Sequence, residues 1–148
     1  MNEHEVQLVA AELDDSPGVQ QLLGAAGLPI AGVDSQFPQA YVVCRQGEAV
    51  VGVAGLERYG TVGLLRSVAV LPSHRGAGMG RALVGNRLGY ASDLGLREVF
   101  LLTTTAPAYF VRFGFGLVER ASAPPALLES PEFTAICPSS AACLAWRP

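Results

Sequence analysis

Apolar and polar residues follow strand-like and helix-like periods in alternating segments of the chain. Residues 5–11 (EVQLVAA) are mostly apolar and predict a first strand. A short apolar helix is predicted over 17–27, because Pro17 suits a helix start and Gly27 suits a helix end. Residues 28–38 contain two prolines and a glycine, which predicts a loop or a helical turn.

The middle of the chain carries a clearer pattern. Residues 40–71 predict an antiparallel meander of three strands, with tight turns at Gln46-Gly47 and Tyr59-Gly60. A helix is predicted at about 78–94, where small and apolar residues recur at spacings of three and four and place one face on a core: Gly80, Val84, Leu88, Ala91 and Leu94. The remainder predicts a strand at 98–105, a short helix at 106–113, a strand at 114–120, a helical turn near Ala126–Ser130 and a last strand at 142–146. This alternation favours an α/β or α+β fold.

Composition narrows the class of protein. The chain has 148 residues, 50% hydrophobic and 16% charged, which predicts a single domain over 1–148 that folds without disulfides or metal. The net charge of −3 gives no basic field, so nucleic acid and anionic membranes are not expected as partners. No apolar run reaches membrane-spanning length, and the acidic N-terminus is unlike a signal peptide. With an odd set of three cysteines, these features predict a cytoplasmic protein with free thiols at Cys44, Cys137 and Cys143.

The strongest local feature is the segment SVAVLPSHRGAGMGRALV, residues 67–84, in which a strand, a glycine-dense loop and a helix follow one another. Glycines let backbone N–H groups approach an anion, and a helix start adds unpaired donors and a positive dipole end. Arg75 and Arg81 add cationic side chains. A P-loop would need Lys-Ser or Lys-Thr after Gly80, and the dinucleotide fingerprint fails at its last glycine. The segment predicts a pyrophosphate cradle; the alternative is a glycine-rich turn that only caps a helix.

Two motifs in this region carry a resemblance to a known family. Arg75-Gly76-Ala77-Gly78-Met79-Gly80 resembles the Arg/Gln-x-x-Gly-x-Gly/Ala motif of the GNAT superfamily of acyl-CoA-dependent N-acetyltransferases, and Val68-Ala69-Val70 resembles the strand before it. TTTAPAYFVRFGF resembles the family's second acyl-CoA segment, which ends in Gly-Phe, here Gly114-Phe115. The resemblance implies a mixed, mostly antiparallel sheet of about seven strands flanked by helices, with strand 67–71 splayed from its neighbour. It also implies acetyl-CoA as cosubstrate, with no metal, bound by Val68, Ala69, Val70, Arg75, Gly76, Ala77, Gly78, Met79, Gly80 and Arg81.

A narrower resemblance concerns the acceptor. VGVAGLERYG, LLRSVAV, LLTTTA and EFTAICPSSAACL resemble the arsenic-resistance N-acetyltransferase branch, and LLTTTAPAYFVRFGF resembles the acetyltransferase domain of N-acetylglutamate synthase. Both imply a small-molecule amine acceptor that is amino-acid-like, and the first implies an arsenic-bearing amino acid. Half-exposed C-terminal strands also favour a homodimer. The alternative from another class is a non-catalytic acyl-CoA-binding sensor with the same fold.

Glu57 and Arg66 are charges within otherwise apolar strands. If Tyr59-Gly60 forms the turn, Glu57 lies opposite Val62, and parity then places Glu57 and Arg66 on one face of the sheet. A register shift of two residues keeps this result. The functional interpretation makes Glu57 a water-mediated base and Arg66 the anchor of an acceptor carboxylate. The alternative is a mutual salt bridge or a solvated strand end.

The residue at the position of the family's general acid differs from the family pattern. Many members carry a tyrosine four residues before the glycine of Gly-Phe, and this position is Phe110. Tyr109 is adjacent but points about 100° away on a helix, so it is either the acid or a packed aromatic. Substrate contacts are also predicted for Ser67, Phe110, Thr103, Thr104 and Thr105, although β-propensity alone explains threonines in a strand.

The cysteines offer a covalent route in principle. None of them lies near the two acyl-CoA motifs in sequence, which favours direct attack by the amine. Cys137 and Cys143 as ligands of a trivalent arsenical are a further hypothesis, because soft thiolates suit soft ions.

Overall fold

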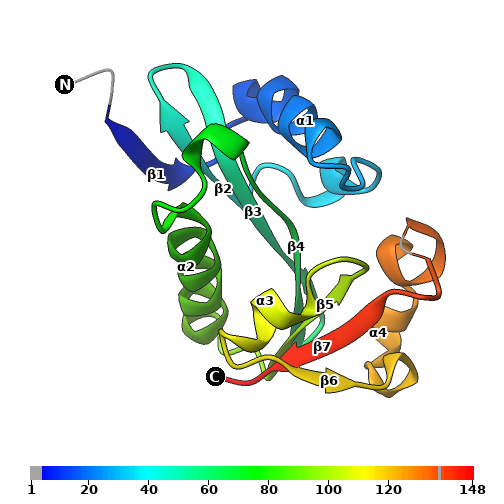
Figure 1. The fold of residues 1–148 in the computed structure, drawn as a ribbon. Coiled ribbons are helices and arrows are strands. Elements are labelled where there is room, and N and C mark those ends of the chain that lie inside the picture. The colour runs from blue at the N-terminus through cyan, green and yellow to red at the C-terminus, as the bar shows by residue number, and fades with distance from the viewer. Residues whose placement is uncertain (1–4, 137) are drawn as a thin grey trace.

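The computed structural model describes residues 5–136 and 138–148, and these form a seven-stranded sheet with the order β1-β2-β3-β4-β5-β7-β6 (Figure 1). The strands are β1 (Val6–Ala10), β2 (Tyr41–Gln46), β3 (Ala49–Tyr59), β4 (Val62–Val70), β5 (Glu98–Thr103), β6 (Gly116–Val118) and β7 (Ala142–Trp146). Neighbouring strands are antiparallel except for the parallel pair of β4 and β5. The expected mixed, mostly antiparallel sheet is therefore confirmed.

Within the described residues, helices flank the sheet: α1 (Ser16–Ala25), α2 (Met79–Asp93), α3 (Pro107–Val111) and α4 (Pro125–Leu128). Figure 1 shows α1 and α2 on opposite sides of β2, β3 and β4. Val53 of β3 packs in the same core as Leu23 of α1, whereas its neighbour Ala54 packs with Leu83 of α2. The strands thus alternate between two apolar cores, as strands covered on both faces must.

The meander predicted over 40–71 is confirmed, but both of its turns lie one residue later than expected. The turn residues are Gly47–Glu48 and Gly60–Thr61, and both glycines have positive φ, of 63° and 66°. Glycine therefore sits at the first central position of each two-residue turn, where a positive φ is needed. Glu57 consequently lies opposite Leu64 and not opposite Val62. This correction is a shift of two residues, so the predicted face is unchanged.

A β-bulge interrupts β4 beside the centre of the sheet. Gly55 pairs with Arg66 and Val53 with Ala69, so β4 has one residue more than β3 between these pairs. Ser67 takes up the extra residue with φ of 59°, a left-handed conformation that residues with a side chain rarely adopt. The bulge interrupts the alternation of β4 side chains between the two faces of the sheet, so that both Arg66 and Ala69 lie on the face that α1 covers.

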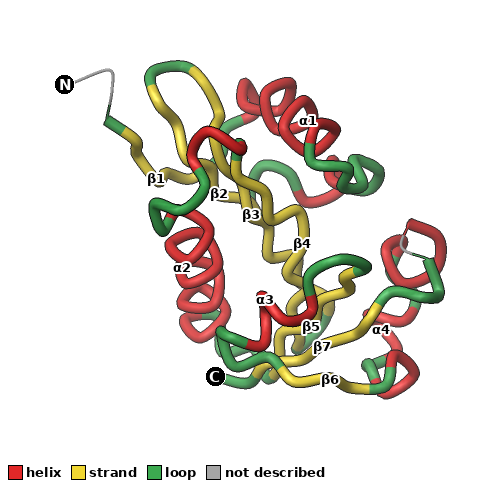
Figure 2. Tube along the Cα trace, viewed as in Figure 1, coloured by secondary structure: helices red, strands yellow, loops and turns green. Residues whose placement is uncertain are grey.

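Beyond the bulge, β4 separates from its other neighbour. The pairing between β4 and β5 covers Val62–Leu64 and Glu98–Phe100. The edge of β4 from Arg66 to Val70 is therefore open on the β5 side, as expected from the family resemblance. Beyond this opening, β5, β7 and β6 complete the sheet, with α3 and α4 in the connections (Figure 2).

The second half of the chain follows the predicted order with shorter elements. The strand predicted at 98–105 ends two residues earlier, as Glu98–Thr103. The strand predicted at 114–120 is shorter at both ends, as Gly116–Val118. A π-helical segment, Glu132–Ile136, is a feature that the sequence pattern did not predict. None of the helices in the described part of the chain is both long and apolar enough to cross a membrane.

Candidate active site

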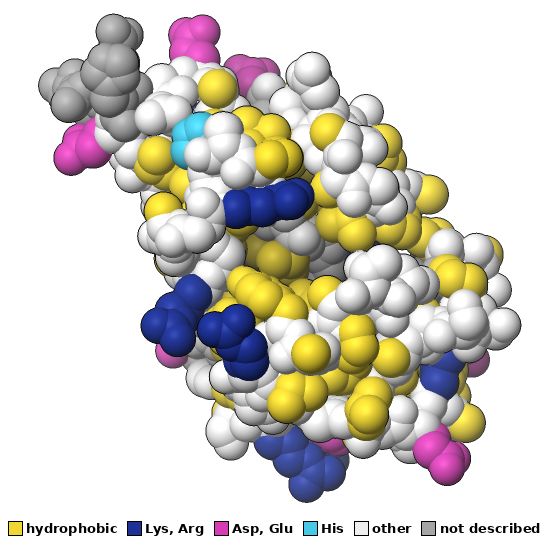
Figure 3. Space-filling view, in the orientation of Figure 1, with side chains coloured by type: hydrophobic (Ala, Val, Ile, Leu, Met, Phe, Trp, Pro, Cys, Tyr) yellow, Lys and Arg dark blue, Asp and Glu magenta, His cyan; other side chains and the backbone are white. Residues whose placement is uncertain are grey.

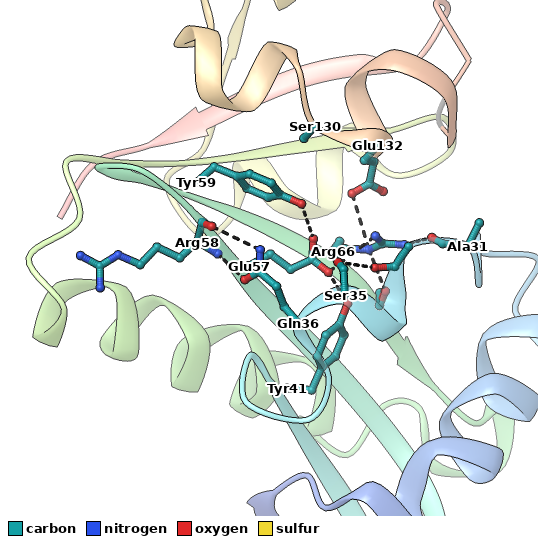
Figure 4. A network of polar contacts seen from close by, with 12 residues as sticks. Ala31, Ser35, Gln36, Tyr41, Glu57, Arg58, Tyr59, Arg66, Ser130 and Glu132 are labelled. Atoms are coloured by element: carbon teal, nitrogen blue, oxygen red, sulfur yellow. Dashed lines mark hydrogen bonds and ion pairs between the residues drawn. The ribbon is translucent and has the colours of Figure 1, made fainter.

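Glu57 and Arg66 contact each other on the α1 face of the sheet, as the parity argument predicts (Figure 4). Arg66 Nη1 lies 3.6 Å from Glu57 Oε2, and the two side chains are 3% and 0% exposed. The pair is therefore a buried salt bridge, and its catalytic use stays a prediction. Such a pair needs further hydrogen bonds to compensate for its lost hydration.

Two tyrosines supply hydrogen bonds to Glu57. Tyr41 of β2 donates to Oε2 over 2.8 Å, and Tyr59 of β3 donates to Oε1 over 2.9 Å. Burial, and then the neighbouring Glu57 carboxylate, raises the pKa of Tyr41 and of Tyr59 well above the usual range. Both hydroxyls therefore stay protonated and donate at neutral pH. Tyr59 is only half-buried, so the network approaches solvent on its side.

Arg66 is held by three further groups from different parts of the chain. Its Nη2 donates to the Ala31 carbonyl over 2.9 Å, and its Nε donates to Ser67 Oγ over 3.2 Å. The same Nε lies 3.5 Å from Glu132 Oε2, in the π-helical segment. Arg66 follows the last residue pair between β4 and β5, so this cluster lies at the opening between the two strands.

The predicted pyrophosphate cradle lies at the start of α2. Gly78 is the N-cap of α2, and no side chain among the described residues caps this helix start. Gly76 and Gly78 have φ of 86° and 82°, and a methyl group on either would meet no described atom within 4 Å. Arg75 and Arg81 are exposed on either side. Unpaired N–H groups, open space and flanking cations together fit a diphosphate.

The surface around this region is hollowed. Figure 3 shows basic side chains grouped around a hollow with hydrophobic side chains in its floor. A groove of about 400 Å³ lies between the loop 73–78 and β1, with Leu8 and Met79 in its walls. This groove lies on the α2 side of the sheet, and the Glu57–Arg66 pair lies on the opposite side.

Val70 presents its backbone to the open edge of β4. Leu71 N–H donates to the Val51 carbonyl of β3 over 2.9 Å, and successive residues of a strand point their backbone groups to opposite edges. The N–H and carbonyl of Val70 therefore face the β5 side. Arg75 Nε already donates to this carbonyl over 3.1 Å, which places the guanidinium beside the open edge.

Tyr109, and not Phe110, reaches the start of α2. A methyl group on Gly80 would lie 2.6 Å from the Tyr109 hydroxyl, so this hydroxyl contacts the first turn of α2. Phe110 packs instead edge-on against Phe115 in the core between α2 and the sheet. Burial raises the pKa of Tyr109, against the opposing effects of Arg112 and Arg81. Tyr109 is thus a protonated donor at the cradle.

The remaining predicted substrate residues divide into two groups. Ser67 joins the cluster through its contact with Arg66. Thr103 Oγ1 accepts hydrogen bonds from the backbone N–H groups of Thr105 and Ala106, so it shapes the turn that follows β5. Thr104 and Thr105 are exposed. Substrate contacts by these three threonines stay a prediction.

The cysteines that the structure describes are poor nucleophiles. Cys44 and Cys143 are free and buried, as predicted. Burial raises the pKa of Cys44, and it raises that of Cys143 to about 11, so both remain thiols at neutral pH. Cys137, the other half of the hypothetical arsenical site, lies outside the described residues. In the parts of the chain that the structure describes, no three His, Cys, Asp or Glu side chains are grouped as a metal site requires.

Sequence reasoning missed three polar partners of the pair. Tyr41 lies on a predicted strand and Tyr59 lies in a predicted turn, and the positions of both beside Glu57 follow from the strand register once it is known. Glu132 comes from a segment without strand or helix period, so no pattern connects it to β4.

Comparison with known proteins places this geometry in a family. Residues 8–115 match the acetyltransferase (GNAT) family. The chain belongs to this family. The predicted membership of the GNAT family is thereby confirmed, while the assignment to the arsenic-resistance branch finds no support in the relatives described below.

One curated relative is an amino-acid acetyltransferase from Mycobacterium tuberculosis, 41% identical over 71 residues. The match spans 47% of this chain and 40% of that relative, so the two proteins are similar only in part. A solved Mycobacterium tuberculosis protein in complex with CoA and NLQ has a TM-score of 0.80 at 24% identity, over 96% of this chain and 99% of that one. N-Acetylglutamate synthase from Neisseria gonorrhoeae, complexed with coenzyme A and N-acetyl-glutamate, has a TM-score of 0.81 at 18% identity, over 97% of this chain and 35% of that one. At these identities the solved structures establish the shared fold.

Proposed function

We propose that this protein transfers the acetyl group of acetyl-CoA to the amine of a small amino acid. The observation that carries the proposal is the position of the buried Glu57–Arg66 pair at the opening between β4 and β5. The cradle at α2 lies on the opposite face of the sheet, so donor and acceptor can meet through the opening. The amino-acid acetyltransferase relative and the solved complex with N-acetyl-glutamate support an amino acid as acceptor.

The residues at the start of α2 fit the cosubstrate. The backbone around Gly76 and Gly78, with Arg75 and Arg81 beside it, would bind the diphosphate of acetyl-CoA. Ala77, Met79 and Gly80 complete this cradle. The open edge of β4, from Val68 through Ala69 to Val70, would hold the pantetheine arm by strand-like hydrogen bonds. When bound, acetyl-CoA supplies the acetyl group as a thioester, whose thiol leaves readily because thiols have pKa values near ~8.5.

On the acceptor side, the chain must bind and deprotonate an amine. Glu57 has no exposed surface, so an amine proton must reach it through a water or through the half-buried Tyr59 hydroxyl. Arg66 carries the planar, always charged group that suits a carboxylate. The Val70 N–H, on the open edge, is positioned to donate to a developing oxyanion, and Tyr109 can donate a proton to the leaving thiolate.

The deciding experiment is an acceptor screen that follows thiol release from acetyl-CoA. The panel contains glutamate and other α-amino acids, phosphinothricin, arsinothricin and polyamines. The arsenic-bearing acceptor is one arm of the panel, because the relatives described here give it no support. We expect α-amino acids with an acidic side group to react best. Better turnover of polyamines would overturn the amino-acid acceptor.

The kinetics of an Arg66 variant test whether this residue binds the acceptor. Arg66→Lys keeps one charge but loses the planar fork, so the KM for the acceptor should rise by more than the KM for acetyl-CoA. Tight binding of acetyl-CoA without turnover of any acceptor would instead identify a non-catalytic sensor.

A further inference from the structure

Arg66 lies between two carboxylates, those of Glu57 and Glu132. Its Nη1 is 3.6 Å from Glu57 Oε2, and its Nε is 3.5 Å from Glu132 Oε2. Glu132 is 5% exposed, and the Arg66 side chain is 3% exposed. Both distances exceed the 2.7–2.9 Å of a charge-assisted hydrogen bond, so each pair is an ionic contact without short bonds. By formal charge these three side chains sum to −1.

The two carboxylates are held in different ways. Glu57 lies on β3 inside the sheet and accepts hydrogen bonds from Tyr41 and Tyr59. Glu132 begins the π-helical segment, which lies outside the sheet and packs near α4 (Figure 4). Moving Glu57 would break its hydrogen bonds with Tyr41 and Tyr59 and disturb strands of the sheet. Moving Glu132 changes a segment that belongs to no strand.

We infer that the Glu132 carboxylate occupies the place on Arg66 that the carboxylate of the amino-acid acceptor takes during catalysis, an inference that rests on the proposed function. A third carboxylate beside Arg66 would add like charge to a buried group that already carries excess negative charge, which is costly. An acceptor carboxylate therefore binds Arg66 by exchange with one of the two acids. Glu132 is the one that leaves, because the tyrosines hold Glu57.

This exchange makes Glu132 a determinant of acceptor specificity. An acceptor with a carboxylate restores the ion pair that it displaces, and the charge of the cluster is conserved. An amine without a carboxylate has nothing to exchange, so it gains nothing from Arg66. Glu132 thus competes with the true acceptor, and its charge weakens the binding of that acceptor.

The test compares Glu132→Gln with the wild-type protein in steady-state kinetics. The matched control is Glu129→Gln, which neutralises an exposed acid at the end of α4. Removal of the competing charge should lower the KM for the amino acid by about tenfold, the equivalent of about 1.4 kcal/mol, with the KM for acetyl-CoA unchanged. The KM for the decarboxylated amine of the same acceptor should not fall, and Glu129→Gln should behave as the wild type.

An unchanged or raised amino-acid KM in Glu132→Gln overturns the inference and leaves the proposed function intact. Acetylation of no amino acid by either protein overturns the proposed function and the inference with it. If Glu132→Gln does not fold, the test uses the wild-type protein and compares its kcat/KM for an amino acid with its kcat/KM for the amide of that amino acid. The amide cannot replace an ion pair, so we expect its kcat/KM to be at least about tenfold lower. Equal values for the acid and the amide would contradict the exchange.

Discussion

The Tyr41 ring lies directly against Gly55, its register partner on β3. A methyl group at Gly55 would overlap the ring, so only glycine leaves room for it there. From this position the Tyr41 hydroxyl reaches Glu57, two residues further along β3, over 2.8 Å. Gly55 thus positions a hydrogen-bond donor of the active site.

Gly55→Ala should displace the Tyr41 ring and loosen the Glu57 carboxylate. Overpacking of this kind costs about 1–3 kcal/mol in the free energy of unfolding, and we expect kcat/KM for the acceptor to fall in parallel. Chemical denaturation and acceptor kinetics measure the two effects. Gly89→Ala is the control, because a methyl group there on α2 meets no described atom within 4 Å. A Gly55→Ala protein with wild-type stability and kinetics would contradict the positioning role.

Gly78→Val should impair acetyl-CoA binding more than folding. Valine rarely adopts the φ of 82° found here, and its side chain would occupy space beside the backbone donors of the α2 start. We expect the KM for acetyl-CoA to rise at least about tenfold, and the strain to cost about 1–3 kcal/mol.

The control for this variant is Gly85→Ala, on an open position inside the same helix. Alanine favours a helix interior over glycine by about 1 kcal/mol, so this variant should be slightly more stable with an unchanged KM. A folded Gly78→Val protein with a wild-type KM for acetyl-CoA would refute the cradle.

The Asp15–Arg45 pair predicts a specific loss of stability in acid. Arg45 Nη2 lies 2.7 Å from Asp15 Oδ2, and its Nε donates to Oδ1 over 3.0 Å. Burial alone would raise the pKa of Asp15, but the hydrogen bonds from Arg45 and from the Glu12 N–H outweigh it and lower the pKa. A lowered pKa in the folded state stabilises the protein above the unfolded value of about 3.9, and this contribution is lost as pH falls through the folded value.

Asp15→Asn removes this contribution. Its unfolding free energy at pH 7 should lie below that of the wild type, and the difference should shrink as pH falls from about 5 through the lowered pKa of Asp15. Urea titrations at several pH values provide the measurement, with the exposed neighbour Asp14→Asn as control. A difference between wild type and Asp15→Asn that stays constant with pH would argue against the ionised pair.

The face shared by Glu57 and Arg66 was predictable because parity survives the error in the turn. A turn one residue later moves the partner of Glu57 from Val62 to Leu64, and strand side chains repeat every two residues. The bulge at Ser67 was not predictable in the same way. Its left-handed φ belongs to a residue type that seldom adopts it, so the local sequence carries no signal.

Glu132 illustrates what sequence periodicity cannot reach. Its position depends on how a π-helical segment packs against β4, and that packing is a tertiary contact between segments far apart in the chain. The family pattern places its tyrosine at Phe110 of this chain, and the sequence offers the adjacent Tyr109 instead, but only the orientation of α3 in the structure shows that the Tyr109 hydroxyl lies at Gly80.

Tyr109→Phe tests whether Tyr109 acts as a proton donor or only as a packed aromatic side chain. The variant keeps the ring that packs edge-on against Phe110 and Phe113 and removes only the hydroxyl at the start of α2. A thiol with a pKa near ~8.5 leaves without strong help, so we expect kcat to fall less than about tenfold, against the ~10²–10⁴ typical of a general acid. Steady-state kinetics at saturating acetyl-CoA measure this loss, and Tyr90→Phe, which makes the same change beside Arg87 on α2, is the control. A thousandfold loss in kcat with unchanged acetyl-CoA binding would instead establish Tyr109 as the proton donor, because lost packing or lost cosubstrate contacts would weaken binding and not turnover alone.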